Sequence, residues 1–135
     1  MNAGAAFRLL AKFNGNPPSK AVALRQFESE SSFRLPHDYT SFLQQTNGGE
    51  GFIGDSYLIL WRMEELVEKN KAYQAAEYAP GLFLLGSDGG GEAFAFDMRS
   101  EAKPIVAVPF VGMDLRLIRP VAQSFEVFLE KLLKS

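Results

Sequence analysis

The feature that most constrains the fold is a glycine-rich tetrapeptide between two short apolar runs. Leu82–Ser87 and Glu92–Asp97 are both rich in strand-forming residues, and only Asp-Gly-Gly-Gly at 88–91 separates them. Two strands joined by a four-residue glycine loop form a β-hairpin. Because Leu82–Leu85 is apolar at every position, the pattern indicates a central strand covered on both faces.

Helices are expected mainly at the two ends of the chain, and strands in its middle. Apolar residues at helical spacing predict helices over Ala3–Phe13, about 19–30, about 36–46, about 63–73 and about 125–133. Further strands are predicted over Tyr57–Trp61, Ile105–Phe110 and Leu115–Ile118.

Capping residues support several of these helix boundaries. Pro36 suits the first position of the third helix, and Asn47-Gly48-Gly49 is expected to end it, because asparagine and glycine tolerate left-handed backbone. Ser124 is the expected N-cap of the last helix. Asn70 lies on the apolar side of its helix and is therefore expected to hydrogen-bond a loop backbone.

These elements predict an α+β fold. We expect a mostly antiparallel sheet of four to six strands, packed by N-terminal, middle and C-terminal helices. With 135 residues and no repeat, the chain is expected to form a single domain over residues 1–135. The break at Asn14–Pro18 sets residues 1–18 apart as an N-terminal arm.

Composition argues against several classes of chemistry. The chain has no cysteine and one histidine, so it cannot form disulfides, cysteine-ligated metal centres or a thiol nucleophile. His37 stands at a helix start with no serine placed beside it, so a surface role is the better interpretation. A net charge of −2 gives no electrostatic reason to expect nucleic-acid binding. No cofactor or metal is expected.

The glycine-rich loop is not expected to bind phosphate. No Lys-Ser/Thr pair follows it, a strand rather than a helix comes next, and Asp88 and Glu92 would repel an anion. Asp88, Glu92 and Asp97 also lack the alternating oxygen ligands of a calcium loop. A hydrolase that uses two converging carboxylates stays open, because any two of the 16 acidic residues could meet in space.

No membrane association is expected. The longest apolar stretch, Ile105–Met113, is interrupted by Pro109 and Gly112 and is far shorter than the roughly 20 residues that span a bilayer. Arg8 and Lys12 interrupt the apolar residues near the start, which argues against a signal peptide. We therefore expect a cytoplasmic protein.

Several motifs occur in an order and spacing that resemble a known family. They begin with Leu35-Pro36-x-x-Tyr39-x-x-Phe42-Leu43 and continue through Asn47-Gly48-Gly49-Glu50-Gly51, Leu58-x-Leu60-Trp61, Glu64-Glu65-Leu66 with Asn70, Gly86-Ser87-Asp88-Gly89-Gly90-Gly91-Glu92, and Ser124-Phe125-x-x-Phe128-Leu129. Over about residues 20–133 the chain resembles the SUKH superfamily, named for the Smi/Knr cell-wall assembly regulators.

The resemblance implies a non-catalytic α+β domain that binds a protein partner. Bacterial members are mostly immunity proteins that bind and neutralise a toxin, often a nuclease, whereas fungal relatives act as regulatory scaffolds. An immunity protein is the leading hypothesis, and the scaffold and the small hydrolase are the alternatives. Excess acidic residues after residue 27 suit a partner with a basic groove.

The motif positions supply the candidate site residues. We expect partner-binding residues at Trp61, Glu64, Asp88, Glu92 and Asp97, and structural roles for Pro36, Gly48, Gly49, Asn70, Gly89, Gly90 and Gly91. Trp61 is either an exposed aromatic anchor or a core residue, with the two about equally favoured. For Asp88, formation of the turn ahead of the glycines is favoured over binding.

Overall fold

The computed structural model describes residues 13–18, 20–30 and 34–134. Most of the helix predicted over Ala3–Phe13, and the predicted cap Ser19, lie outside these ranges. Phe13 itself is described, and it begins a strand rather than ending a helix.

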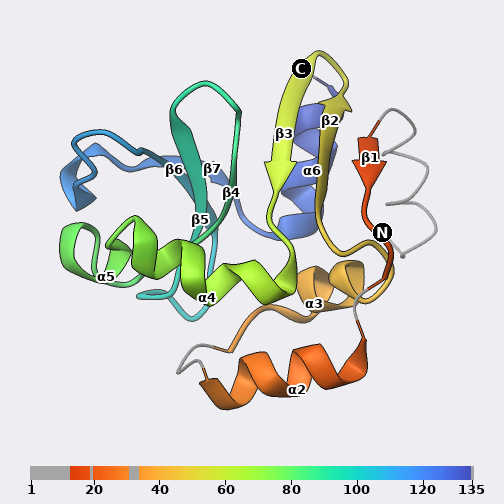
Figure 1. Ribbon diagram of the computed structural model, residues 1–135. Coiled ribbons are helices and arrows are strands. Elements are labelled where there is room, and N and C mark those ends of the chain that lie inside the picture. The colour runs from red at the N-terminus through yellow and green to blue at the C-terminus, as the bar shows by residue number, and fades with distance from the viewer. Residues whose placement is uncertain (1–12, 19, 31–33, 135) are drawn as a thin grey trace.

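The described residues form one antiparallel sheet of seven strands (Figure 1). The order in the sheet follows the order in the chain, and every neighbouring pair is antiparallel. The strands are β1 (Phe13–Gly15), β2 (Gly49–Ile53), β3 (Ser56–Leu60), β4 (Leu82–Ser87), β5 (Glu92–Asp97), β6 (Ile105–Pro109) and β7 (Arg119–Ala122). The α+β prediction is confirmed, with more strands than the four to six expected.

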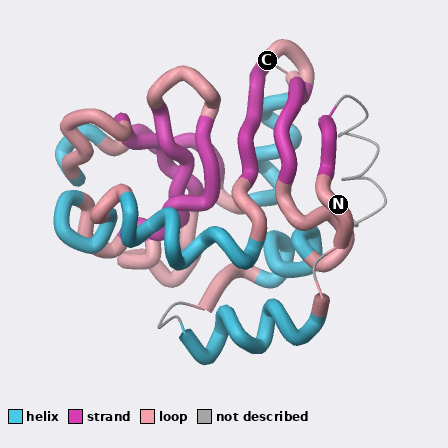
Figure 2. The backbone as a smooth tube through the Cα atoms, in the orientation of Figure 1, coloured by secondary structure: helices cyan, strands magenta, loops and turns pink. Residues whose placement is uncertain are grey.

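The helices of the described ranges lie between the strands along the chain and after the last strand (Figure 2). They are α2 (Ala21–Glu30), α3 (His37–Leu43), α4 (Met63–Ala72), α5 (Ala75–Tyr78), the 3₁₀ turn η1 (Leu115–Leu117) and α6 (Phe125–Leu133). Figure 1 shows α6 behind β2 and β3, and α4 crossing the near side of the sheet.

An aromatic core joins α3 and α6 to the sheet. Tyr39 of α3 lies 5.0 Å, centroid to centroid, from both Phe96 of β5 and Phe125 of α6. Phe94 contacts Phe128 of α6 at 4.8 Å in an edge-to-face arrangement. Such contacts add to the stabilisation from apolar burial. The face of β5 that carries Phe94 and Phe96 is therefore the face covered by α6.

The predicted hairpin is confirmed as β4 and β5. Every residue of β4 is buried, as expected for a strand covered on both faces. The sheet nevertheless opens between β3 and β4, which pair only at Ile59–Ser87 and Leu60–Gly86. The pairing of β4 with β5 contains a bulge between Leu84 and Gly86. Beyond this point α4, rather than a strand, faces β4.

Two local predictions are wrong in their details. Leu115–Ile118 was expected to be a strand, but Asp114 accepts a hydrogen bond from the Arg116 backbone N–H and starts the turn η1, so that β7 begins at Arg119. The helix expected to reach Thr46 ends at Leu43, and Pro36 is its N-cap rather than its first residue.

Candidate functional site

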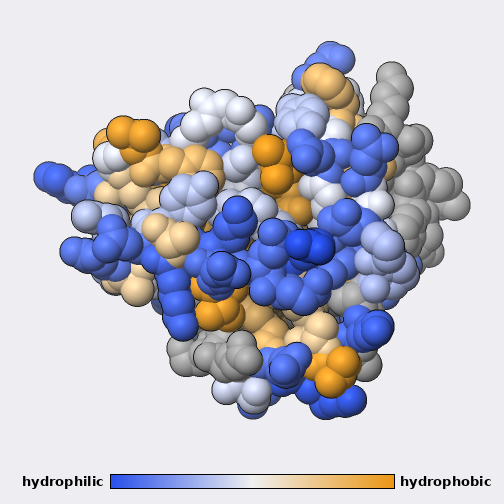
Figure 3. Space-filling view, viewed as in Figure 1, coloured by the Kyte–Doolittle hydropathy of each residue, from blue (hydrophilic) through white to orange (hydrophobic). Residues whose placement is uncertain are grey.

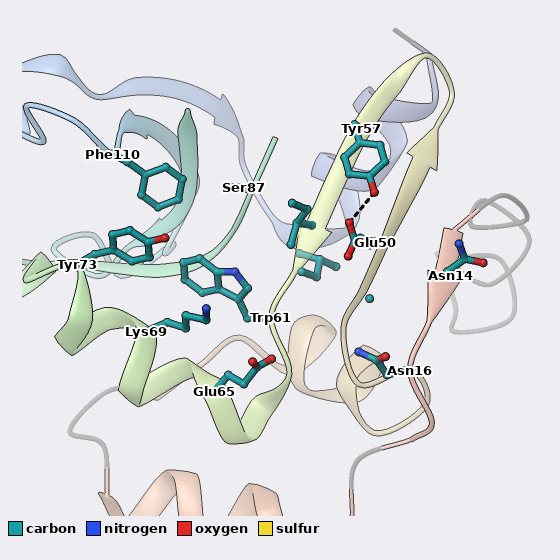
Figure 4. A pocket seen from close by; sticks show the side chains of 13 residues that line it. Asn14, Asn16, Glu50, Tyr57, Trp61, Glu65, Lys69, Tyr73, Ser87 and Phe110 are labelled. Atoms are coloured by element: carbon teal, nitrogen blue, oxygen red, sulfur yellow. Dashed lines mark hydrogen bonds between the residues drawn. The ribbon is translucent and has the colours of Figure 1, made fainter. Parts of the chain in front are cut away.

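A groove of about 760 Å³ opens on the near face of the molecule between β3 and α4 (Figure 4). Figure 3 shows that polar and apolar residues are mixed on this face. The groove is lined by Asn14, Asn16, Gly49, Glu50, Tyr57, Ile59, Leu60, Trp61, Glu65, Lys69, Tyr73, Ser87 and Phe110.

Three aromatic rings form one wall of the groove. Trp61 follows β3, Tyr73 follows α4, and Phe110 follows β6, where its backbone N–H donates to the carbonyl of Gly91 at 3.0 Å. The rings of Trp61 and Tyr73 are nearly parallel, 8° apart with centroids separated by 5.9 Å, and Phe110 lies 4.5 Å from Tyr73. Trp61 is 8% exposed, whereas Tyr73 is 40% exposed and presents apolar surface to the groove.

Lys69 extends from α4 over the Trp61 ring. Its ammonium nitrogen lies 5.8 Å from the ring centroid, within the range of a cation–π interaction. Among the residues that the structure describes, no carboxylate lies within ion-pair distance of this ammonium. The groove thus contains a cation that lies over an aromatic ring and makes no ion pair with an acid of the described residues, although its charge also acts on Glu65.

The two carboxylates of the groove have partners within the chain. The Tyr57 hydroxyl donates to Glu50 at 2.6 Å, and this hydrogen bond is the main reason that the pKa of Tyr57 is raised. Glu65 accepts hydrogen bonds from the Arg62 backbone N–H at 3.1 Å and side-chain Nε at 3.2 Å. Burial alone would raise the pKa of Glu65, but the contacts with Arg62 and the nearby charge of Lys69 lower it overall.

Comparison with protein families decides the class of domain. Residues 18–131 match the model of the SMI1/KNR4 family (SUKH-1). The chain belongs to the SUKH-1 family. No curated protein matches it in a search of full sequences. Within the described ranges, no helix is long and apolar enough to cross a membrane, and no group of three His, Asp or Glu side chains could hold a metal ion.

The SUKH-1 fold does not bring the five predicted binding residues together. Trp61 lies in the groove. Glu64, at the start of α4, accepts a 2.8 Å hydrogen bond from the Asn47 side chain, whose other end accepts from the Met63 backbone N–H. Asp88 accepts from the backbone N–H groups of Gly90 and Glu92, which is the turn contact expected from its position.

The other two predicted residues lie elsewhere on the sheet. Glu92 alternates with Phe94 and so falls on the α6 side, where Arg119 Nη2 lies 3.3 Å from its carboxylate. Asp97, at the far end of the hairpin, makes two 2.9 Å side-chain hydrogen bonds with Arg99, which are the main cause of its lowered pKa. Hence only Trp61 of the five lines the groove.

The structural motif residues shape the groove and its supports. Pro36 caps α3, and Asn70 hydrogen-bonds β4 rather than a loop. Gly48 has φ of +74°, and a Cβ there would lie 2.5 Å from the Leu60 carbonyl oxygen, so this SUKH-1 glycine lets two backbones meet. The β4–β5 turn contains Gly89, Gly90 and Gly91.

Sequence reasoning missed most of the groove. Lys69, Tyr73 and Phe110 were not singled out. The available signal was that Tyr73 is an aromatic residue at the end of an amphipathic helix. Nothing local shows that Phe110, 37 positions later, contacts it.

Proposed function

We propose that this domain acts by binding a protein, as a bacterial immunity protein that occludes the active site of a toxin in the cytoplasm. The groove between β3 and α4 is the proposed binding surface. The observation that carries the proposal is its aromatic wall, where Tyr73 and Phe110 stand beside the mostly buried Trp61. Aromatic residues in such settings often dominate binding energy at protein interfaces.

Family membership supports a binding role over a catalytic one. The carboxylates of the groove accept hydrogen bonds from Tyr57 and Arg62, so neither is an isolated acid positioned for proton transfer. Glu64, Asp88, Glu92 and Asp97 stay predicted contacts outside the groove. A regulatory scaffold of the Smi/Knr type would use the same kind of surface for a different partner.

Co-expression with the toxin encoded by the neighbouring reading frame tests the proposal. The full chain is expected to restore growth and to co-purify with that toxin. The double variant Tyr73→Ser/Phe110→Ser is expected to weaken the complex by about 30-fold or more, because truncation of aromatic hot spots costs about 2 kcal/mol or more.

Tyr78→Ser is the matched control, because Tyr78 is 50% exposed on α5 and lies outside the groove. It is expected to change the dissociation constant by less than about threefold. Glu92→Lys tests the α6 side of the sheet independently. Failure of the wild-type chain to bind the toxin or to restore growth would reject the immunity role. A complex that the Tyr73→Ser/Phe110→Ser variant does not weaken would show that the interface lies outside the groove.

A further inference from the structure

The Trp61 side chain carries a hydrogen-bond donor that the described part of the chain does not use. The residue is 8% exposed, and its indole N–H has no hydrogen-bond partner among the described residues. The nitrogen is not among the fully buried unpartnered polar atoms of these residues, so it is open to solvent in the groove. Figure 4 shows the indole nitrogen on the side of the ring that faces β3 across the groove. Tryptophan N–H groups normally donate a hydrogen bond when they are buried, so a partner that removes water from the groove would need to supply an acceptor here.

Lys69 provides a positive charge at the same place. Figure 4 shows its ammonium directed toward the Trp61 ring, and the separation of 5.8 Å from the ring centroid places the charge over the ring that carries the N–H. Glu65, whose pKa the charge of Lys69 helps to lower, is hydrogen-bonded to Arg62. Glu50 stands on β2 and accepts from Tyr57. An acceptor that carries a negative charge would satisfy both the ammonium and the indole.

We propose that the groove receives an acidic side chain, Asp or Glu, from a loop of its protein partner, with an adjacent apolar residue against Tyr73 and Phe110. The carboxylate accepts from the indole N–H of Trp61 and pairs with Lys69. This inference rests on the proposed function only in taking the occupant to be a protein.

A basic side chain from the partner fits the same groove less well. Lys69 already takes the cation–π position on Trp61, so a second cation would meet like charge at close range. It would also displace water from the indole donor without supplying an acceptor, and leaving a donor unsatisfied in a complex weakens binding.

The chain contains one tryptophan, so its indole N–H gives a single resonance in a ¹⁵N–¹H correlation spectrum. We would titrate the ¹⁵N-labelled full chain with the dipeptide amide acetyl-Phe-Asp-NH₂. Acetyl-Phe-Asn-NH₂ and acetyl-Phe-Lys-NH₂ are the neutral and basic controls. The acidic probe is expected to shift the indole resonance saturably and to bind at least about tenfold more tightly than either control, as expected for a charge-assisted hydrogen bond.

Lys69→Met tests the role of the ammonium, with Lys71→Met as control on the exposed side of the same helix. We expect Lys69→Met to remove the preference for the acidic probe and Lys71→Met to preserve it. Equal binding of the three probes, preference for the lysine probe, no saturable indole shift, or retention of the acidic preference in Lys69→Met would each overturn the proposal.

The same variants in the toxin complex separate this inference from the proposed function. If the acidic probe binds through Lys69 but the toxin does not bind, the immunity role fails and the groove assignment stands. If the toxin binds and rescue occurs but the probes show no acidic preference, the immunity role stands and the proposed acidic occupant of the groove is rejected.

Discussion

The side-chain amide of Asn70 hydrogen-bonds both backbone groups of Leu84. The Leu84 N–H donates to Asn70 Oδ1 at 2.7 Å, and Asn70 Nδ2 donates to the Leu84 carbonyl at 3.0 Å. This pairing lies where β3 has separated from β4, so one side chain of α4 replaces a missing strand residue. It fixes the helix that carries Lys69, and thereby one side of the groove.

Asn70→Ala is expected to destabilise the protein by about 2 kcal/mol or more, because two backbone groups of a buried strand lose their partner. Alanine is the better helix former, so a loss of stability would show that the contact with β4 outweighs helix propensity. Urea unfolding measures the change. Glu68→Ala, on the exposed side of α4, should stay within about 0.5 kcal/mol of wild type; equal effects would contradict the role of Asn70.

Gly86 and Gly90 should respond very differently to alanine. A Cβ on Gly86 would lie 1.9 Å from the Ile59 carbonyl oxygen, whereas the nearest atom to a Cβ on Gly90 is Asp88 Oδ1 at 3.6 Å. Gly86→Ala must push β3 away from β4 and is expected to cost about 3 kcal/mol or more. Gly90→Ala is expected to be near neutral in thermal denaturation. Similar melting temperatures for the two variants would refute the close approach.

The ion pair between Asp97 and Arg99 should make stability depend on pH in the acid range. Side-chain hydrogen bonds from Arg99 lower the pKa of Asp97 in the folded state, so between the folded and unfolded pKa values the unfolded chain binds more protons. The contribution is complete above the unfolded pKa of about 3.9 and is lost as pH falls through the lower folded value.

Denaturant unfolding of wild type and Asp97→Asn across pH 2 to 7, a range that spans the unfolded pKa of about 3.9, measures this contribution. The stability advantage of wild type should be constant near neutrality and should shrink as the solution becomes more acidic. A stability advantage of wild type that grows on acidification would contradict the predicted lowering of the Asp97 pKa in the folded state.

The cap of the last helix offers a smaller and cleaner test. The Ser124 hydroxyl accepts a 3.1 Å hydrogen bond from the Val127 backbone N–H. Ser124→Ala is expected to cost about 1 kcal/mol, and Ser124→Asp should keep most of that stability because a carboxylate also caps. Chemical denaturation of both variants checks the prediction; an aspartate variant as unstable as the alanine variant would argue against capping.

Elements with a strong local signal could be predicted from the sequence. The β4–β5 hairpin followed from its glycine loop, and α6 followed from Ser124 and the apolar spacing after it. Strand β2 was missed because Asn47-Gly48-Gly49 was expected to end a helix. In the structure Gly49 has φ of +140° and is the first residue of β2. A Cβ on Gly49 would lie 2.3 Å from the Asn14 carbonyl oxygen, so its glycine serves contact with β1, which only the folded sheet reveals.

The candidate site was predictable only in part. Trp61 could be singled out, but its two possible roles could not be separated, and the structure gives it both a mostly buried ring and one donor facing the groove. Glu64 and Asp97 looked like surface acids because their partners, Asn47 and Arg99, are contacts of side chains whose directions the sequence does not encode.

The order of the strands in the sheet, which follows their order in the chain, has a consequence for self-association. Within the described ranges, its first and last strands form the two edges of the sheet, and an exposed edge can template pairing with another molecule. One edge, β1, is three residues long, and the other, β7, contains Pro120, which has no N–H to donate. Both edges are therefore poor templates for intermolecular β-pairing, so the described sheet gives copies of this chain little opportunity to join edge to edge.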